Sequence, residues 1–114
     1  MTTESGRRKG LPPAQKVRLG SAVEYQVGSV VSRTIIESNA GTITLFAFDL
    51  GEGLSEHTAP FDALIQVIDG SAEVTISGEP HRLDSGESII LPAGEPHSLR
   101  APQRFKMLLT MIRR

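Results

Sequence analysis

From residue 28 onward, short runs of β-branched and apolar residues alternate with glycine, proline and asparagine, and this pattern restricts the fold more than any other feature. Turn residues recur at intervals of about 8 to 12 residues, which favours short strands over long helices. The strands are expected at residues 29–37, 42–50, 63–68, 72–76, 81–83, 88–91, 96–100 and 105–112. We therefore predict an all-β domain, a small barrel or jelly roll.

Three turns between these strands contain glycine. Residues 39–41 and 77–79 are expected to close hairpins, and Asp69-Gly70 is expected to end one strand before the next begins. The run 89–91 is apolar at consecutive positions, and so is the run 63–68 apart from Gln66. A strand that is apolar on both faces is typical of burial between two sheets or at a subunit interface.

The first 15 residues differ in composition from the remainder. They contain glycine, proline, serine and threonine, and show neither the strand period of 2 nor the helical period of 3.6. We predict that residues 1–15 form a mobile or disordered leader. The length of 114 residues corresponds to one domain, so residues 16–114 are expected to form a single barrel.

Composition excludes several classes of function. The chain has no cysteine, which excludes disulfides, thiolate nucleophiles and iron-sulfur clusters. Residues 10–112 hold 7 basic and 12 acidic residues, a net charge of −5, so we expect no nucleic-acid partner. Neither a signal peptide nor an apolar run of the ~18 residues needed to span a membrane is visible, so we expect no membrane association and a cytoplasmic protein.

The chain has three histidines, His57, His81 and His97. Imidazole is the side chain best suited to metal binding and proton transfer near neutral pH. The stretch from Gly86 to His97 resembles the second cupin motif, G-x5-P-x-G-x2-H-x3-N, with alanine at the position of the final asparagine. Four fixed positions of that motif are therefore matched.

The stretch from Gly51 to Gly70 resembles the first cupin motif, G-x5-H-x-H-x3-E-x6-G, with His57 as its first histidine. Ala59 stands at the second histidine and Ala63 at the glutamate. Over roughly residues 30–111 the chain is similar to small single-domain cupins of the RmlC-like, cupin 2 type. The resemblance implies a cupin-type jelly-roll barrel with both motif histidines at one end of its interior.

A cupin with the full pattern holds Fe, Mn, Ni or Zn through three histidines and one glutamate. The resemblance carries over only His57 and His97 as metal ligands. His81 could supply a third ligand, and Asp62 could do so if Pro60 interrupted the strand register. In the alternative without a metal, the two histidines bond to each other, to water or to backbone carbonyls.

Three functions fit these residues. The first is a barrel that binds a small molecule near His57 and His97; the two alanines are expected to enlarge and dry the cavity, which favours an apolar or weakly polar ligand. Its wall is expected to contain Phe61, Ala63, Ile65, Val67 and Met107. The second is a metal-dependent dioxygenase, isomerase or lyase, and the third a metal-free enzyme with a histidine base. The apolar strands and the resemblance also predict a homodimer.

Overall fold

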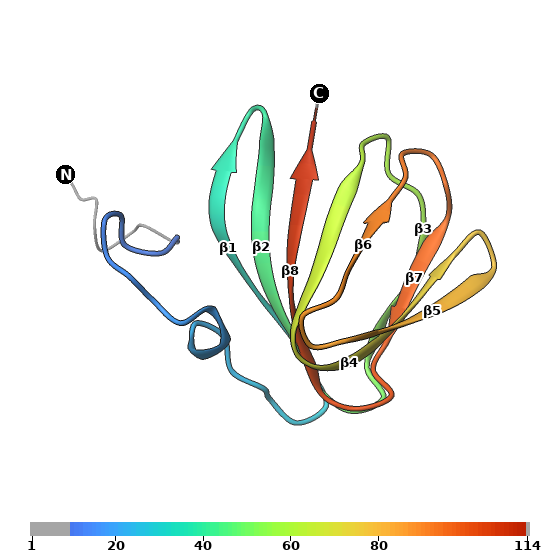
Figure 1. Cartoon of the computed structure of the whole chain (residues 1–114), viewed down its shortest axis with the longest axis horizontal. Coiled ribbons are helices and arrows are strands. Elements are labelled where there is room, and N and C mark those ends of the chain that lie inside the picture. The colour runs from blue at the N-terminus through green and yellow to red at the C-terminus, as the bar shows by residue number, and fades with distance from the viewer. Residues whose placement is uncertain (1–9, 114) are drawn as a thin grey trace.

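The computed structural model describes residues 10–113, whose strands form a curved, open barrel (Figure 1). Within this range the structure has eight strands, one short 3-10 turn and no α-helix, which confirms the all-β prediction. The elements are η1 (Leu19–Ser21), β1 (Val30–Ser38), β2 (Gly41–Phe48), β3 (Gly53–His57), β4 (Ala63–Ile76), β5 (Glu79–Asp84), β6 (Ser88–Leu91), β7 (His97–Arg100) and β8 (Phe105–Ile112). The single helical turn within residues 10–113 is far too short to cross a membrane.

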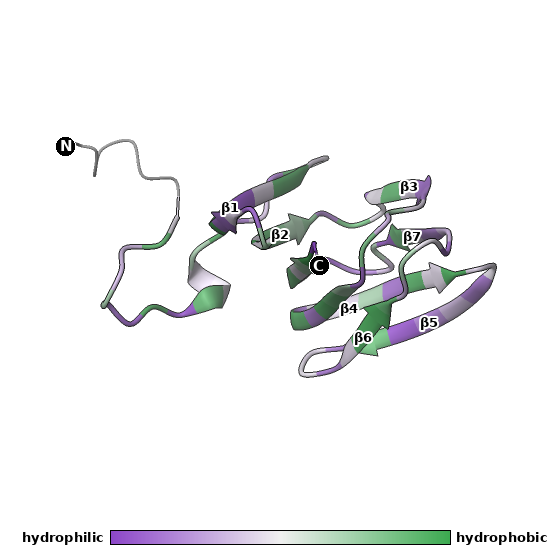
Figure 2. Ribbon diagram, turned by 90° about the horizontal axis from the view of Figure 1, so that it is seen from above, coloured by the Kyte–Doolittle hydropathy of each residue, from purple (hydrophilic) through white to green (hydrophobic). Residues whose placement is uncertain are grey.

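Two antiparallel sheets share the strand β4. The first sheet contains β1, β2, β8, β6 and the first half of β4, and the second contains β3, β7, β5 and the second half of β4. Seen from above, the strands of both sheets curve around a common interior (Figure 2). The side chains that alternate toward this interior therefore meet across the barrel.

The strand β4 corrects one prediction. Asp69-Gly70 does not separate two strands, because β4 runs without interruption for 14 residues. Its pairing with β8 shifts register between Val67 and Asp69, and Gly70 has a φ of +75°. A Cβ at Gly70 would lie 1.8 Å from the carbonyl oxygen of Arg104. The register shift between Val67 and Asp69, followed by Gly70, thus marks the bulge at which β4 leaves the first sheet and enters the second.

Most other expected elements are present with small changes. The last strand covers residues 105–112 as predicted, and the hairpins at 39–41 and 77–79 are confirmed. In each hairpin the observed turn is shorter than predicted, because the second strand already begins at Gly41 or at Glu79. Alternation of apolar and polar residues was therefore a sufficient signal wherever it was regular.

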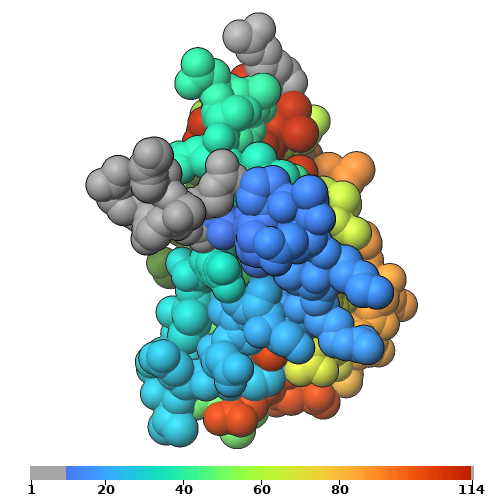
Figure 3. Space-filling model, turned by 90° about the vertical axis from the view of Figure 1, so that its left-hand side faces the viewer, coloured from blue at the N-terminus to red at the C-terminus, as the bar shows by residue number. Residues whose placement is uncertain are grey.

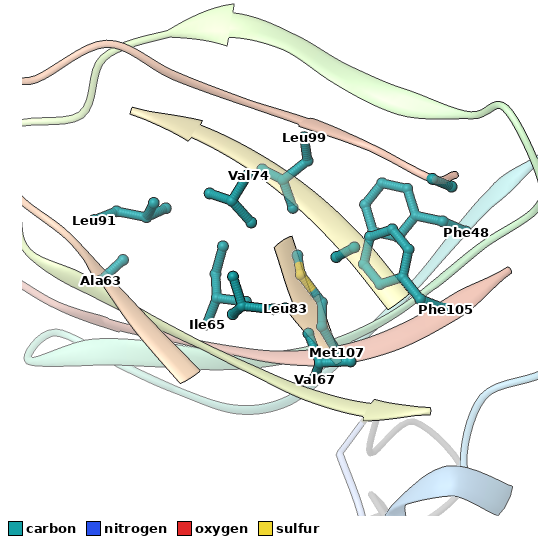
Figure 4. Close-up of a cluster of buried hydrophobic side chains, with 12 residues drawn as sticks. Phe48, Ala63, Ile65, Val67, Val74, Leu83, Leu91, Leu99, Phe105 and Met107 are labelled. Carbon is teal, nitrogen blue, oxygen red and sulfur yellow. The ribbon is translucent and has the colours of Figure 1, made fainter. Parts of the chain in front are cut away.

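Apolar side chains from both sheets fill the interior (Figure 4). Phe48 and Phe105 are paired across β2 and β8, and their rings stack with centroids 4.4 Å apart. Ala63 and Leu91 lie at the opposite end of this core (Figure 4). The largest side chains are concentrated at one end of the interior, and the end near Ala63 keeps space for a site.

A second buried cluster lies on the outer face of the first sheet. Val23, which follows η1, is buried there together with Leu45 and Ala47 of β2. The side chain of Arg33 donates a hydrogen bond to the carbonyl of Ala22, 3.0 Å away. Figure 3 shows the segment before β1 lying across this side of the molecule. The outer face of the first sheet is therefore covered in part by the chain itself.

The predicted leader, residues 1–15, lies largely outside the described residues, which begin at residue 10. Residues 10–15 contain neither helix nor strand. Gly10 lies close to the edge of β1, since a Cβ at this position would be 2.3 Å from the carbonyl oxygen of Ile35. Residues 10–15 thus follow the edge strand of the first sheet, and the mobility of the leader stays a prediction.

Candidate functional site

The strand ends that carry the two motif histidines lie at the same end of the barrel (Figure 1). The strands β3, β6 and β8 finish there, and β4 and β7 begin there. His57 is the last residue of β3 and His97 the first residue of β7, and the two are register partners. The pairing is irregular between Leu54 and His57. The fold thus brings together two histidines that are 40 positions apart.

The two imidazoles point their Nε2 atoms at each other. These atoms are 3.2 Å apart, and the ring planes are inclined by 70°. His57 Nδ1 lies 3.0 Å from the carbonyl oxygen of Ser55, and His97 Nδ1 lies 3.2 Å from that of Glu95. A carbonyl oxygen only accepts hydrogen bonds, so both of these contacts are hydrogen bonds only in the tautomer in which each Nδ1 carries the proton and donates it.

This tautomer assignment leaves both Nε2 atoms with a lone pair in the neutral state. Two lone pairs 3.2 Å apart cannot hydrogen-bond to each other without an added proton. The pair therefore attracts a positive or electron-poor partner, which is a shared proton, a hydrogen-bond donor of a ligand or a metal ion. The backbone carbonyls of Ser55 and Glu95 favour this tautomer.

The two histidines differ in exposure. His97 is buried with 6% of its surface exposed, whereas His57 faces solvent. Burial lowers the pKa of His97 below its ordinary value, the nearby His57 acts in the same direction, and the Glu95 carbonyl partly opposes both. The His97 imidazole is thus held toward its neutral form, with a lone pair directed at the mouth of the barrel.

A small cavity lies behind the histidine pair. Its volume is about 50 Å³, and its walls are formed by Leu54, His57, Ala59, Ala63, Ile65, Leu91, His97, Leu99, Met107, Leu109 and Met111. Apart from the histidines, all of these side chains are apolar. The cavity is apolar as predicted, but it is not large, since pockets for drug-sized ligands have volumes of about 300–1,000 Å³.

Most of the predicted wall residues lie in this cavity. Ala63, Ile65 and Met107 line it together with both histidines. Val67 is buried in the core without lining the cavity, and Phe61 lines a separate surface hollow with Pro60, Asp62, Ala93 and Ile112.

The position of Phe61 has a local cause. The predicted inward orientation of Phe61 would need a regular strand from His57 to Ala63, but β3 ends at His57 and β4 begins at Ala63. The residues between them form a loop, in which strand alternation does not apply. Two hydrogen bonds hold this loop against the next one: Gly94 N donates to Ala59 O, and Ala93 N donates to the Asp62 carboxylate, each over 2.8 Å.

Neither proposed substitute ligand joins the pair. Asp62 is exposed and accepts the hydrogen bond from Ala93, and His81 lies on β5 opposite Val74. Within residues 10–113, no group of three or more His, Asp or Glu side chains is arranged to hold a metal ion. The described site therefore has two nitrogen donors and no carboxylate.

A serine outside the motifs supports the loop that presents His97. The backbone N–H of Ser77 donates to Pro96 O over 2.8 Å, and its hydroxyl donates to the Glu95 carboxylate over 2.9 Å. Glu95 in turn orients His97 through its carbonyl. No sequence signal identified Ser77, because its role depends on the distant loop. Met111 and Leu109 were identifiable, because they alternate with Met107 along β8.

Comparisons with known proteins agree with this architecture. The model of the family Cupin_2, described as a cupin domain, matches residues 44–112. Quercetin 2,3-dioxygenase from Bacillus subtilis (strain 168) is 34% identical over 91 residues, which are 74% of this chain. The chain spans only 26% of that relative's length.

Two solved structures resemble the chain over nearly its whole length. A conserved protein of unknown function from Streptococcus pyogenes has a TM-score of 0.88 at 33% identity, with 92% of each chain covered. A cupin superfamily protein from Desulfitobacterium hafniense DCB-2 has a TM-score of 0.86 at 30% identity, with 93% of this chain and 97% of that chain covered. Neither description names a ligand or a reaction.

Proposed function

The chain belongs to the cupin-domain family Cupin_2, and from this membership we propose that it is a binding module which holds a small ligand on His57 and His97 at the mouth of the barrel. One observation carries the proposal. Each Nδ1 lies within hydrogen-bond distance of a backbone carbonyl, and in the tautomer that donates to both carbonyls two Nε2 lone pairs face each other 3.2 Å apart above an apolar cavity. A ligand that donates a hydrogen bond satisfies them.

The cavity restricts the shape of this ligand. A volume of about 50 Å³ admits only a few heavy atoms, and the apolar walls favour a hydrocarbon group there. The exposed position of His57 leaves room for the rest of the ligand outside the barrel. We therefore expect a hydroxyl group, such as a phenol or an alcohol, attached to an apolar body that is only partly buried.

A metal-dependent enzyme is the second candidate. The name of the Bacillus subtilis relative, a dioxygenase, favours it, although the chain spans only about a quarter of that protein. The set of available metal ligands argues against a metal-dependent enzyme. A site for Fe, Mn, Ni or Zn of the full cupin type needs three histidines and one glutamate, and alanines occupy two of these positions. The residues present do not fit that group.

The binding proposal is tested by NMR with phenol and toluene, two probes that differ in one hydroxyl group. Phenol is expected to shift the imidazole nitrogen resonances of His57 and His97, with a dissociation constant on the order of millimolar for so small a ligand. Toluene lacks the donor and is expected to bind at least several-fold more weakly.

Ala63→Leu fills the cavity and is expected to abolish the phenol shifts. Ala40→Leu adds the same side chain at an exposed turn outside the cavity and should leave them unchanged. Thermal melts establish that both variants are folded. The proposal fails if phenol leaves the histidine resonances unmoved, or if Ala63→Leu binds phenol as the parent does.

A further inference from the structure

The turn between β4 and β5 contacts the loop that carries His97. The last residue of β4, Ile76, is the register partner of His97. The next residue, Ser77, donates its backbone N–H to Pro96 O over 2.8 Å and its hydroxyl to the Glu95 carboxylate over 2.9 Å. Figure 1 shows this hairpin beside β7. The turn residue Ser77 is thus joined to both of the residues that precede His97.

We propose that Ser77 is a positioning residue of the histidine site. Its hydroxyl restrains Glu95, whose backbone carbonyl oxygen lies 3.2 Å from His97 Nδ1. This restraint favours the tautomer in which His97 presents an Nε2 lone pair toward His57. Ser77 does not line the cavity and acts only through the loop. The inference rests on the proposed function, because the ligand is proposed to bind to that lone pair.

The carbonyl that faces His97 belongs to a peptide bond with few other restraints. Its nitrogen is that of Pro96, which has no N–H, so this peptide bond cannot be oriented by donating a hydrogen bond. The N–H of Glu95 makes only a long bond to Pro92 O, of 3.3 Å. The two bonds from Ser77 act on either side of this peptide bond, and we expect them to determine where the carbonyl points.

The identity of residue 77 departs from what its backbone favours. The hairpin turn has two central residues, Ser77 with a φ of +49° and Gly78 with a φ of +84°. Turns with a positive φ at both positions favour Asn, Asp or Gly at the first of them, because most other side chains are strained there. Serine is therefore not the residue that would best stabilise this turn, and its hydroxyl has a separate use in the bond to Glu95.

Two variants separate the effect of the hydroxyl from the stability of the fold. Ser77→Gly removes the hydroxyl and relieves the positive φ, so its melting temperature is expected to equal or exceed that of the parent. Its phenol affinity is nonetheless expected to fall by about two- to tenfold, the range that one hydrogen bond contributes. Ser77→Ala should show the same loss of affinity. A merely structural role would change the affinity and the melting temperature together.

The imidazole nitrogen resonances of His97 provide a readout that needs no ligand. At one fixed pH, the parent should show the tautomer protonated at Nδ1, and both Ser77 variants should shift toward a mixture with the Nε2 tautomer. Ser85→Ala is the matched control, because Ser85 is also an exposed turn serine and donates to the carbonyl of Ile68 over 3.2 Å. This control should leave the His97 resonances and the phenol affinity unchanged.

A double-mutant cycle tests whether Ser77 acts through Glu95. Glu95→Ala removes the carboxylate and keeps the backbone carbonyl, so it should weaken phenol binding as Ser77→Ala does. The double variant should bind phenol no more weakly than either single variant, because both remove the same hydrogen bond. Glu95→Gln keeps an acceptor oxygen and should retain the affinity of the parent. Full additivity of the two alanine variants overturns the inference.

Failure of this inference is separable from failure of the proposed function. If phenol binds the parent and both Ser77 variants equally and the His97 resonances do not change, only the positioning role is overturned. A fall in phenol affinity without a change of tautomer overturns it as well. If phenol does not bind the parent, but the Ser77 variants shift the His97 tautomer and Ser85→Ala does not, the positioning role is supported and the hydroxyl-ligand proposal is overturned.

Discussion

Tyr25 and Asp69, 44 positions apart, are joined by a hydrogen bond in which the tyrosine hydroxyl donates to the carboxylate over 2.5 Å. Tyr25 belongs to the segment before β1, and Asp69 lies at the bulge of β4. The ammonium of Lys106 lies 4.8 Å from the centre of the Tyr25 ring, and the Arg104 guanidinium lies 5.1 Å from it. This cluster fastens the segment to the outside of the barrel at the place where β4 changes sheets.

Loss of the Tyr25 hydroxyl is predicted to destabilise the fold. Tyr25→Phe keeps the ring close to the two cations and removes the hydrogen bond to Asp69, which should lower the free energy of unfolding by about 1 kcal/mol. Urea denaturation at pH 7 measures this change. Val27→Ala, at a side chain that is 86% exposed, is the control and should change little.

Ionisation of the same tyrosine is predicted to destabilise the fold at alkaline pH. Burial, followed by the hydrogen bond and the negative charge of Asp69, raises the pKa of Tyr25 above its ordinary value. A group whose pKa is raised on folding stabilises the protein below its unfolded pKa, about 10 for tyrosine, and this contribution is lost as the pH rises above that value. The parent should therefore lose stability above about pH 10 more steeply than Tyr25→Phe. Parallel curves for the two proteins would contradict this assignment.

Protonation of Asp49 is predicted to destabilise the fold at acid pH. Its carboxylate accepts hydrogen bonds from Arg104 Nε over 2.8 Å and from Gly28 N over 2.7 Å. The bond from Arg104 first, and then those from Gly28 and Leu50, lower the pKa of Asp49 to about 2. A group whose pKa is lowered on folding stabilises the protein above its unfolded pKa of about 3.9, and this contribution is lost as the pH falls toward 2.

Asp49→Asn tests this assignment. The variant is expected to be less stable than the parent at pH 7, and the difference should shrink between about pH 4 and pH 2. Urea denaturation at a series of pH values measures it. Glu79→Gln, an exposed carboxylate at the start of β5, is the control. A difference between parent and Asp49→Asn that is constant with pH would show that the carboxylate charge is not what stabilises this contact.

Gly70 is predicted to tolerate no side chain. It combines a φ of +75° with a backbone contact, since a Cβ would lie 1.8 Å from Arg104 O. Gly70→Ala must therefore displace β8 from β4, and we expect a loss of about 3 kcal/mol or more. Gly78→Ala is the matched control: it has a φ of +84° but no neighbour within 4 Å, and should lose only about 1 kcal/mol. Equal losses would show that φ alone, not the contact with Arg104, determines the cost.

Gly70 also illustrates what the sequence could predict of the fold. Asp-Gly is a strong local signal for a hairpin turn, and whether it forms a turn or a bulge depends on the strand beside it. Here that strand is β8, and Gly70 contacts its first residue, Phe105, and the preceding residue, Arg104. The regular alternation of residues 105–112 needed no such information, so β8 was predicted with its correct bounds.

Part of the candidate site was predictable from the sequence, as part of the fold was. Motif spacing identified His57 and His97, and alternation along strands identified Ile65 and Met107 as wall residues. The loop between β3 and β4 was not predictable, because its path depends on hydrogen bonds to residues 93 and 94. The small cavity volume was not predictable either, since it results from how leucines of four different strands pack together.

From an exposed apolar patch on the outer face of the first sheet, we predict that the chain forms a dimer. Near Leu64, the side chains of Ile90 and Ile112 are 61% and 51% exposed, and they line a shared hollow of about 300 Å³. Exposed apolar patches of this kind mark interaction sites, and we propose that a second copy of the chain covers this one. Light scattering at micromolar concentration should give twice the mass of one chain.

Ile90→Lys should reduce the mass to that of a single chain, because a charge at the centre of an apolar interface is left unpaired. Val27→Lys places the same charge on a side chain that is 86% exposed and outside this hollow, and should leave the dimer intact. A parent that scatters as a single chain at micromolar concentration would refute the proposal.

The two alanines of the first motif predict a gain of metal binding. Ala59 and Ala63 line the same cavity as His57 and His97, although residue 59 lies in the loop and residue 63 in β4. Ala59→His combined with Ala63→Glu adds one imidazole and one carboxylate to the two imidazoles present, which completes the donor set that Zn, Ni or Fe favours. Because the cavity is only about 50 Å³, we expect the metal-free double variant to be less stable than the parent. Metal should restore that stability by linkage, by about 2.7 kcal/mol at a hundredfold excess over the dissociation constant.

Calorimetry and thermal melts with Zn(II) measure both effects, and Ala40→His with Ala93→Glu, at exposed positions outside the cavity, is the control. Equal Zn(II) affinity in the parent and the double variant would show that the new side chains do not reach the histidine pair.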